Sequence, residues 1–332
     1  MAGYIGNQRS VNLVDIQDGT VSNADLAGSI TADKLNVGQL GGRRNLIING
    51  AMQVAQRGTS QTSTSYGSID RYVLFKDGTA SSVSMSQETD NNENYADVDL
   101  DRGTAVSGTR YAIINQRIEG TFICGKQVTV SFDAWGSSAD ECSVDLEYYD
   151  GTNYAYATRQ QLNYTTTRTT YSFTFTVPSF TAETASSFVA LRWINDASSG
   201  SSQSINIKLT NVQLELGSVA TPFEHRSYGE ELALCQRYYE VLRSQQIGGA
   251  FSAGNLVFGT QFAVTKRVVP TMTVIAQGTW IGNGTANAIS STIFTATDPT
   301  GYRTDHNSFA GSVTQGYAYF LRSYTHVADA EL

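Results

Sequence analysis

Two groups of carboxylates stand at the alternating spacing of β-strands. Asp145 and Glu147 would share one face of a strand, and so would Asp97, Asp99 and Asp101. A glycosidase or lyase needs two carboxyl groups that flank a sugar. No neighbouring residue in the sequence marks either group as catalytic, and charged outer faces of edge strands are common because they block aggregation. We therefore interpret both groups as solvated, and the sequence predicts no catalytic residue.

The aspartates and histidines do not form a recognisable metal motif. An EF-hand loop requires Gly directly after its third acid and Glu at its twelfth position, where this sequence has Arg102 and Gly108. The histidines, at positions 225, 306 and 326, have no acid or Cys at ligand spacing, and there is no Gly-x-Ser-x-Gly elbow. We expect no cofactor and no metal site. An isolated structural calcium, held by carboxylates and carbonyls, stays open as an alternative.

Tyrosines around a turn point to binding rather than to catalysis. The run from Tyr148 to Tyr156 places four tyrosines around an Asp-Gly-Thr-Asn turn. Aromatic faces stack on the C–H faces of sugars, and nearby amides and carboxylates bind the hydroxyls. The sequence therefore predicts glycan contacts at Tyr149, Asn153 and Tyr154. The alternative is that Tyr148 and Tyr156 belong to the core and the others are ordinary hairpin residues.

A second set of candidates lies near the C-terminal end. Trp280 is flanked by the turn residues of Gly278-Thr279 and Gly282-Asn283-Gly284, so we expect it to be exposed and to contact glycan. The alternative is that Trp280 packs into the core of the C-terminal domain. Loops on a rigid sheet are where binding residues accumulate. On this basis we expect further glycan contacts at Tyr302, Asp305 and His306. Trp135 and Trp193 lie on apolar strands, and we expect them in the core.

The composition favours a β-rich protein and excludes several functions. Charged residues make up 16% of the 332-residue chain, against roughly 25% in ordinary domains, while it has 18 Tyr and 14 Phe. The net charge of −8, without clusters of Lys and Arg, argues against nucleic-acid binding. Three cysteines without CxxC spacing indicate buried thiols. The sequence shows no signal peptide and no run of ~20 apolar residues, so we expect no membrane insertion.

The patterning predicts an all-β fold in four parts. Residues 1–43 would be an extended N-terminal arm with one short helix, too poor in core residues to fold without a partner. About nine alternating strands over 44–228 predict a jelly-roll-like antiparallel β-sandwich. Residues 229–247 would be a linking helix, clearest from Glu230 to Arg243. Residues 248–332 would be a smaller C-terminal β domain, the tip.

Several stretches resemble bacteriophage tail fibre and receptor-binding proteins. The peptide Asp18–Ile30 looks like the beginning of such fibres. Asn45–Gly58, followed by Asp70-Arg71-Tyr72, looks like the opening of their sandwich, with Tyr72 in place of the usual Trp. Val212–Ser218, Pro222-Phe223-Glu224 and Glu230–Tyr239 are similar to the end of that domain and its helix. The closing residues 328–332 are also similar.

The resemblance implies a structural virion protein, made in the host cytoplasm, with a sandwich similar to carbohydrate-binding modules. It implies a homotrimer that docks on a phage tail or adaptor protein by its N-terminal arm and contacts host cell-surface polysaccharide. Within the arm, the apolar residues expected to dock are Val21, Leu26, Ile30 and Leu35. Two alternatives remain: a glycan-depolymerising tailspike enzyme, and a purely architectural fibre without receptor binding.

Overall fold

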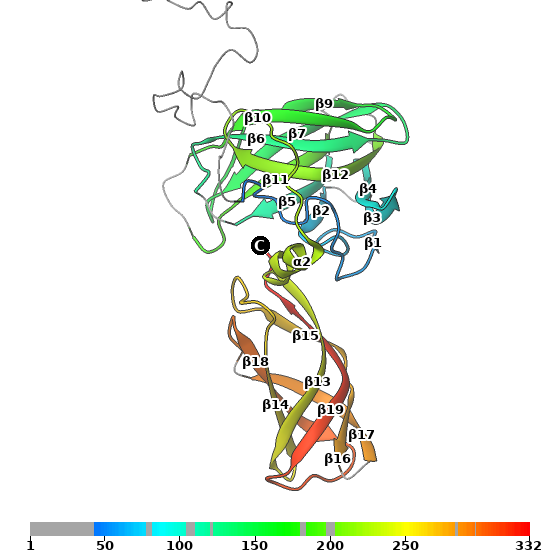
Figure 1. The fold of residues 1–332 in the computed structure, drawn as a ribbon, viewed down its shortest axis with the longest axis vertical. Coiled ribbons are helices and arrows are strands. Elements are labelled where there is room, and N and C mark those ends of the chain that lie inside the picture. The colour runs from blue at the N-terminus through cyan, green and yellow to red at the C-terminus, as the bar shows by residue number, and fades with distance from the viewer. Residues whose placement is uncertain are drawn as a thin grey trace, which may run out of the picture.

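A computed structural model describes residues 43–77, 82–103, 110–119, 122–179, 184–196, 203–282, 285–295 and 297–332. The expected arm, apart from Arg43, lies outside these ranges. The same holds for the expected docking residues Val21, Leu26, Ile30 and Leu35. Figure 1 shows two β domains arranged along the long axis, with a short helix between them.

The first domain is a sandwich of two antiparallel sheets, as the sequence predicts. One sheet has the order β1-β3-β4-β12-β6-β10, and the other has the order β2-β5-β11-β7-β8, with β9 also paired to β7. The strands are β1 (Ser60–Gln61), β2 (Tyr72–Lys76), β3 (Ser82–Asp90), β4 (Glu93–Asp101), β5 (Tyr111–Ile118), β6 (Gln127–Trp135), β7 (Asp140–Tyr149), β8 (Tyr154–Tyr156), β9 (Gln160–Tyr164), β10 (Thr169–Thr176), β11 (Phe188–Asp196) and β12 (Ser204–Leu216).

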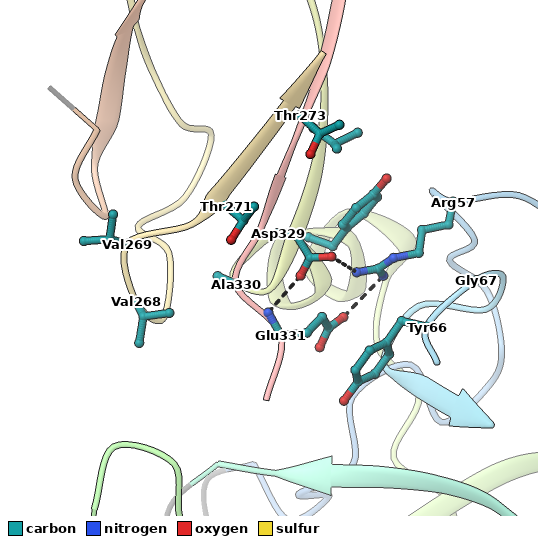
Figure 2. A pocket seen from close by; sticks show the side chains of 12 residues that line it. Arg57, Tyr66, Gly67, Val268, Val269, Thr271, Thr273, Asp329, Ala330 and Glu331 are labelled. Atoms are coloured by element: carbon teal, nitrogen blue, oxygen red, sulfur yellow. Dashed lines mark hydrogen bonds and ion pairs between the residues drawn. The ribbon is translucent and has the colours of Figure 1, made fainter. Parts of the chain in front are cut away.

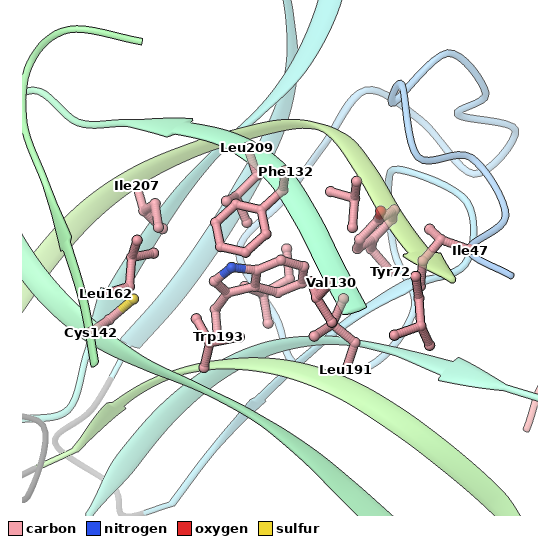
Figure 3. Packing of buried hydrophobic residues seen from close by; sticks show 14 of the residues in the cluster. Ile47, Tyr72, Val130, Phe132, Cys142, Leu162, Leu191, Trp193, Ile207 and Leu209 are labelled. Carbon is pink, nitrogen blue, oxygen red and sulfur yellow. The ribbon is translucent and has the colours of Figure 1, made fainter. Parts of the chain in front are cut away.

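Alternating apolar residues from both sheets fill the space between them. Trp193 lies at the centre, fully buried, with its ring edge-on to Phe132 at 5.2 Å (Figure 3). The expectation that Trp193 is a core residue is confirmed. Trp135 differs, because it faces outward from the other sheet and is half-buried against Tyr95, with ring centroids 5.1 Å apart.

The apolar run Asn45–Gly50 crosses the end of the sandwich as irregular chain rather than as a strand. Asn45 replaces strand pairing with side-chain hydrogen bonds: its Oδ1 accepts from the amides of Ile47 and Leu214 at 2.9 and 3.1 Å. A Cβ on Gly50 would lie 2.2 Å from the carbonyl oxygen of Val212, so this position requires glycine. The motif therefore serves close backbone packing.

The linking helix is shorter than the sequence predicts. Helix α2 spans Tyr228–Gln236 and begins with a capping box, in which Ser227 and Glu230 bind each other's backbone amides. The chain then enters strand β13 (Tyr239–Ser252), so the expected helix over 229–247 is wrong in its second half. The reason is tertiary: residues 239–249 pair with β19, and aromatic and β-branched residues there suit a strand.

The C-terminal domain is a curved antiparallel sheet of seven strands in the order β13-β14-β18-β17-β16-β19-β15. Because β13 also pairs with β19, six of the strands close on themselves. Strands β16 and β18 occupy segments that the sequence led us to expect as loops. The remaining bounds are β14 (Asn255–Gln261), β15 (Thr271–Ala276), β16 (Thr279–Gly282), β17 (Thr285–Thr295), β18 (Gly301–Phe309) and β19 (Ala318–Asp329).

Trp280 is a core residue of this domain, so the expectation that it is exposed is wrong. Only 2% of its surface is accessible. Its ring packs edge-on against Phe309 and Tyr319, at 5.7 and 5.2 Å, and its Nε1 donates to the carbonyl of Ala310 at 3.1 Å. Pairing of β16 with both β17 and β19 turns this side chain inward.

Tyr302, Asp305 and His306 are also buried, contrary to expectation. Tyr302 and His306 lie on β18 and face the inside of the closed sheet, whereas Asp305 faces the outside, where it pairs with Arg303 at 2.8 Å. The Tyr302 hydroxyl is 2.6 Å from Nε2 of His326. His306 lies 2.9 Å from the hydroxyl of Thr292. Tyr302 and His306 belong to a polar core and have no exposed surface to offer a receptor, while the carboxylate of Asp305 is bound by Arg303 and Thr295.

The two domains meet at an interface, which we call the seam, and ion pairs connect them there. Arg71 and Glu331 form an ion pair in which the side chains are 1% and 6% exposed. Arg57 binds Glu331 and Asp329, both at 3.3 Å. The Arg57 guanidinium also lies 3.5 Å above the ring of Tyr239. The end of β19 is thus tied directly to the opening segment of the sandwich.

The polar core predicts an acid-sensitive C-terminal domain. Burial lowers the pKa of His306 and of His326 to about 4. In the unfolded chain both histidines would titrate near their ordinary pKa of 6.5. Between about pH 4 and pH 6.5 the unfolded state therefore binds more protons than the folded state. Stability is therefore complete above about pH 6.5 and is lost as pH falls toward about 4.

Calorimetry at about pH 7 and about pH 4.5 tests this expectation. The transition of the C-terminal domain should shift to lower temperature on acidification, and His326→Gln should reduce that shift. The exposed His225 supplies the matched control, since His225→Gln should leave the shift unchanged. If acidification lowered the unfolding temperature equally in wild type and in His326→Gln, His326 would not be a cause of the acid sensitivity.

Candidate functional site

A groove of about 660 Å³ lies on the outer face of the sheet β2-β5-β11-β7-β8. The strands expose alternate residues there, because the other half of each strand faces the core. The groove is lined by Phe75, Tyr111, Ile113, Asn115, Arg117, Asp145, Glu147, Tyr154, Tyr156, Ala157, Arg159, Arg192, Ile194 and Asp196. We call this surface the groove.

Asp145 and Glu147 form part of the floor of the groove. Arg192 on β11 donates two hydrogen bonds to Asp145, from Nε at 2.7 Å and from Nη2 at 2.8 Å. Its Nη1 donates to Glu147 at 2.5 Å. The expectation that these carboxylates are solvated on an edge strand is wrong. Strand β7 lies inside the sheet, and its register places Asp145 directly opposite Arg192.

The electrostatics of the floor are balanced. Arg159 bonds Asp196 at 2.6 Å and Asp145 at 3.4 Å. Burial raises the pKa of Glu147, while the positive charge of Arg192 opposes that rise. The groove thus carries three arginines and three carboxylates, so it presents polar groups without a net charge.

Asn115 adds an amide to the floor. It is 3% exposed, and its Oδ1 has no hydrogen-bond partner among the described residues. Leaving a buried acceptor without a partner costs about 1–3 kcal/mol. Asn115 therefore offers an amide oxygen without a partner at the floor of the groove.

Two tyrosines form the aromatic rim. Tyr154 and Tyr156 are each 54% exposed, and the Arg192 guanidinium lies 4.8 Å from the ring centre of Tyr156. The alternative that placed Tyr156 in the core is therefore wrong. The hairpin pairs Tyr156 with Glu147 and pairs the buried Tyr148 with Ala155, so Tyr156 shares the outer face.

The three residues predicted in the hairpin come together, with different roles. Tyr149 stacks on Tyr154 at 4.5 Å. Asn153 is exposed at the turn, where its amide nitrogen is 3.4 Å from Asp150, and it does not line the groove. Asp150 holds the turn by accepting from the amides of Thr152 and Asn153 at 2.7 and 2.6 Å.

A second cavity, of about 650 Å³, opens at the seam (Figure 2). From the sandwich it is lined by Arg57, Tyr66 and Gly67. From the C-terminal domain it is lined by Tyr239, Val268, Val269, Thr271, Thr273, Val327, Asp329, Ala330 and Glu331. We call it the seam cavity. The sequence offers no local pattern for it, because residues more than two hundred positions apart form it.

Asn115, Arg117 and Arg192 are groove residues that the sequence reasoning missed. Each stands on a strand that was predicted correctly. Arg192 has apolar neighbours on both sides, which could have marked it as facing outward, but the polar run Asn115-Gln116-Arg117 does not show which of its residues face out. Within the described residues no group of three or more His, Cys, Asp or Glu could hold a metal ion. Nor does any helix formed by them have the length and apolar character of a membrane span.

The sequence matches one family model, that of the carbohydrate binding domain, over residues 72–199. No curated protein matches it. Among solved structures, a family 4 carbohydrate-binding module is 18% identical and covers 51% of this chain and 97% of its own, with a TM-score of 0.34. A family 11 module from Clostridium thermocellum, solved with a β-1,3-1,4-mixed-linked tetrasaccharide, is 12% identical and covers 49% and 98%, with a TM-score of 0.34.

The enzymatically active domain of tailspike protein 4 from bacteriophage CBA120 is 16% identical, with a TM-score of 0.33. The match covers 52% of this chain and 21% of that one. These structural likenesses concern the sandwich fold alone. The family match is more specific, because every residue that lines the groove lies within it. Residues 72–199 are therefore similar to the carbohydrate binding domain family, and they contain the groove.

Proposed function

We propose that this chain binds glycans in the groove and that it does so as a non-enzymatic subunit of a bacteriophage tail fibre. The observation that carries the proposal is the groove itself: two half-exposed tyrosines stand over a floor of paired charges and amides, inside the stretch that matches the carbohydrate binding domain family. Aromatic faces with a few fixed polar groups are what sugar recognition requires.

The fibre role is supported by sequence motifs outside that stretch. The opening segment Asn45–Gly58 and the closing Val212–Glu224 resemble phage fibre proteins, and both pack at the seam end of the sandwich. The proposed location is the virion, with docking through residues 1–43. The proposed receptor is a polysaccharide of the host surface.

Stacking on Tyr156 should account for part of the binding energy. Replacing Tyr156 by Ala should weaken binding of the best glycan on an array by about 1 kcal/mol, because one aromatic contact is lost. Titration calorimetry on the full chain measures this. Tyr228→Ala is the matched control: Tyr228 is 57% exposed but lies on α2, outside the groove. Equal affinity of wild type and Tyr156→Ala would refute the groove as the site.

A glycan-depolymerising activity is the second candidate. In its favour, burial raises the pKa of Glu147, as a general acid requires, and Asp145 lies on the same face. Against it, Arg192 bridges the two carboxylates and so occupies the space that a scissile bond would need.

We therefore expect no release of reducing ends when the full chain is incubated with a bound polysaccharide. Glu147→Gln should alter affinity, because it weakens the contact with Arg192, but both proteins should give the same background of reducing ends. Release by wild type that Glu147→Gln abolishes would establish the enzyme instead.

The proposed assembly is a homotrimer. Three large apolar side chains are exposed near each other on the C-terminal domain: Ile247 at 74%, Phe251 at 69% and Tyr317 at 63%. The amide of Ala250, next to Phe251, bonds the carbonyl of Tyr317 at 3.1 Å. Exposed apolar surface of this kind marks contacts between chains.

Light scattering of the full chain should give the mass of three copies at about micromolar concentration. Phe251→Glu should shift the mass toward one copy, because it buries a charge at the contact. Phe122→Glu is the control, since Phe122 is 53% exposed on the sandwich. A wild-type monomer would rule out the trimer.

A further inference from the structure

The groove does not end at its tyrosine rim. A cavity of about 660 Å³ adjoins it, between the sandwich and the C-terminal domain. From the sandwich it is lined by Arg117, Tyr149, Tyr154, Thr184, Ala185, Ser186 and Phe188. From the C-terminal domain it is lined by Arg267, Val268, Glu331 and Leu332. We call it the middle cavity.

The middle cavity joins the other two. Arg117 and Tyr154 line both it and the groove, so these two cavities are neighbours. Val268 and Glu331 line both it and the seam cavity. The three cavities therefore follow one another from the face of the sandwich to the C-terminal domain, and we call this row of cavities the depression.

The lining has the same chemistry throughout. In the middle cavity Tyr149 stacks on Tyr154 and packs on Phe188 at 5.4 Å, and the hydroxyl of Ser186 is exposed beside them. The seam cavity is lined by Tyr66 and by threonines at 271 and 273, and it also contains Tyr239, whose ring is covered by the Arg57 guanidinium. Aromatic faces alternating with hydroxyls suit a ligand that repeats C–H faces and hydroxyl groups.

The charges along the whole depression cancel. Its lining contains five arginines and five carboxylates: Arg57, Arg117, Arg159, Arg192 and Arg267, against Asp145, Glu147, Asp196, Asp329 and Glu331. A polyanionic ligand would meet as many negative as positive groups. The balance favours a neutral ligand.

The C-terminal side of the depression is firmly held in place. Arg267 donates to the carbonyl oxygens of Ala185, Ala330 and Glu331, each at 3.1 Å. One side chain thus connects a sandwich loop with the end of β19. A site held in this way loses little conformational entropy when a ligand binds.

From these observations we propose that one extended, neutral polysaccharide chain runs from the groove through the middle cavity into the seam cavity, so that the C-terminal domain completes the binding site. The inference rests on the proposed glycan binding in the groove. It adds that the complete site belongs to the two-domain chain rather than to the sandwich alone, and that affinity grows with the length of the glycan.

Titration of the full chain with neutral oligosaccharides of about two to eight sugar units, chosen from one array-positive series, tests this. Affinity should rise by about tenfold or more between the short and the long members. Val268→Trp should remove that gain in affinity while the short oligosaccharides still bind, because Val268 lines the middle cavity and the seam cavity but not the groove. Ser186→Trp, which blocks the middle cavity from the sandwich side, should do the same if Val268→Trp fails to fold.

Ile275→Trp is the matched control, because Ile275 is 63% exposed and lines none of the three cavities. Binding that does not depend on length, or long oligosaccharides that bind both Trp variants as well as wild type, would overturn the inference and leave groove binding intact. A preference for acidic over neutral oligosaccharides would overturn its charge argument. No binding of any glycan would instead refute the proposed function.

Discussion

The buried ion pair between Arg71 and Glu331 is the interaction on which the arrangement of the two domains depends. Arg71 has a left-handed backbone, with φ of 73°, which is costly for a residue with a side chain. Its guanidinium also donates to the carbonyl of Arg117 at 2.5 Å, and Arg117 lines the groove. Removing one partner of such a buried pair costs about 3–5 kcal/mol. The same contact therefore connects the C-terminal end of the chain to the floor of the binding surface.

This connection explains why the groove and the seam are best considered together. A groove on an isolated sandwich would end at the Tyr149–Tyr154 stack. Here the end of β19 and Arg267 continue the surface beyond that stack. Arg57, Arg159 and Arg192 pair with carboxylates and Arg267 donates to carbonyl oxygens, so the depression presents polar groups without a net charge. Pairing also keeps Asp145 and Glu147 engaged with Arg192, which favours binding over catalysis.

The sequence predicted the sandwich well because its strands alternate strictly. Val128, Val130 and Phe132 face the core as their period-two spacing requires. The sequence-based prediction failed where pairing with another strand determines the secondary structure or the burial of a residue. The helix pattern ran on to Arg243, yet pairing with β19 makes residues from Tyr239 onward a strand. Trp280 has turn residues on both sides, yet two neighbouring strands bury it.

The candidate site was predicted in part for the same reason. Tyr154 lies in the groove and Tyr149 stacks beside it, as their local hairpin allowed us to expect, whereas Asn153 from the same turn does not line the groove. Arg192 was missed because its role in the groove depends on its contact with Asp145, and only the register of strands β7 and β11 brings these two residues together. Tyr156 was assigned to the wrong face in one alternative, although the length of the turn sets the pairing. The seam cavity could not be predicted, because it needs the domains in place.

Hydrogen exchange of the full chain, with and without a saturating array-positive oligosaccharide, tests most directly where the glycan binds. The account predicts protection in β5, β7, β8 and β11, which form the groove, and in residues 267–273, most of which line the middle cavity or the seam cavity. Protection confined to the opposite sheet, around Tyr95 and Trp135 on β4 and β6, would contradict it.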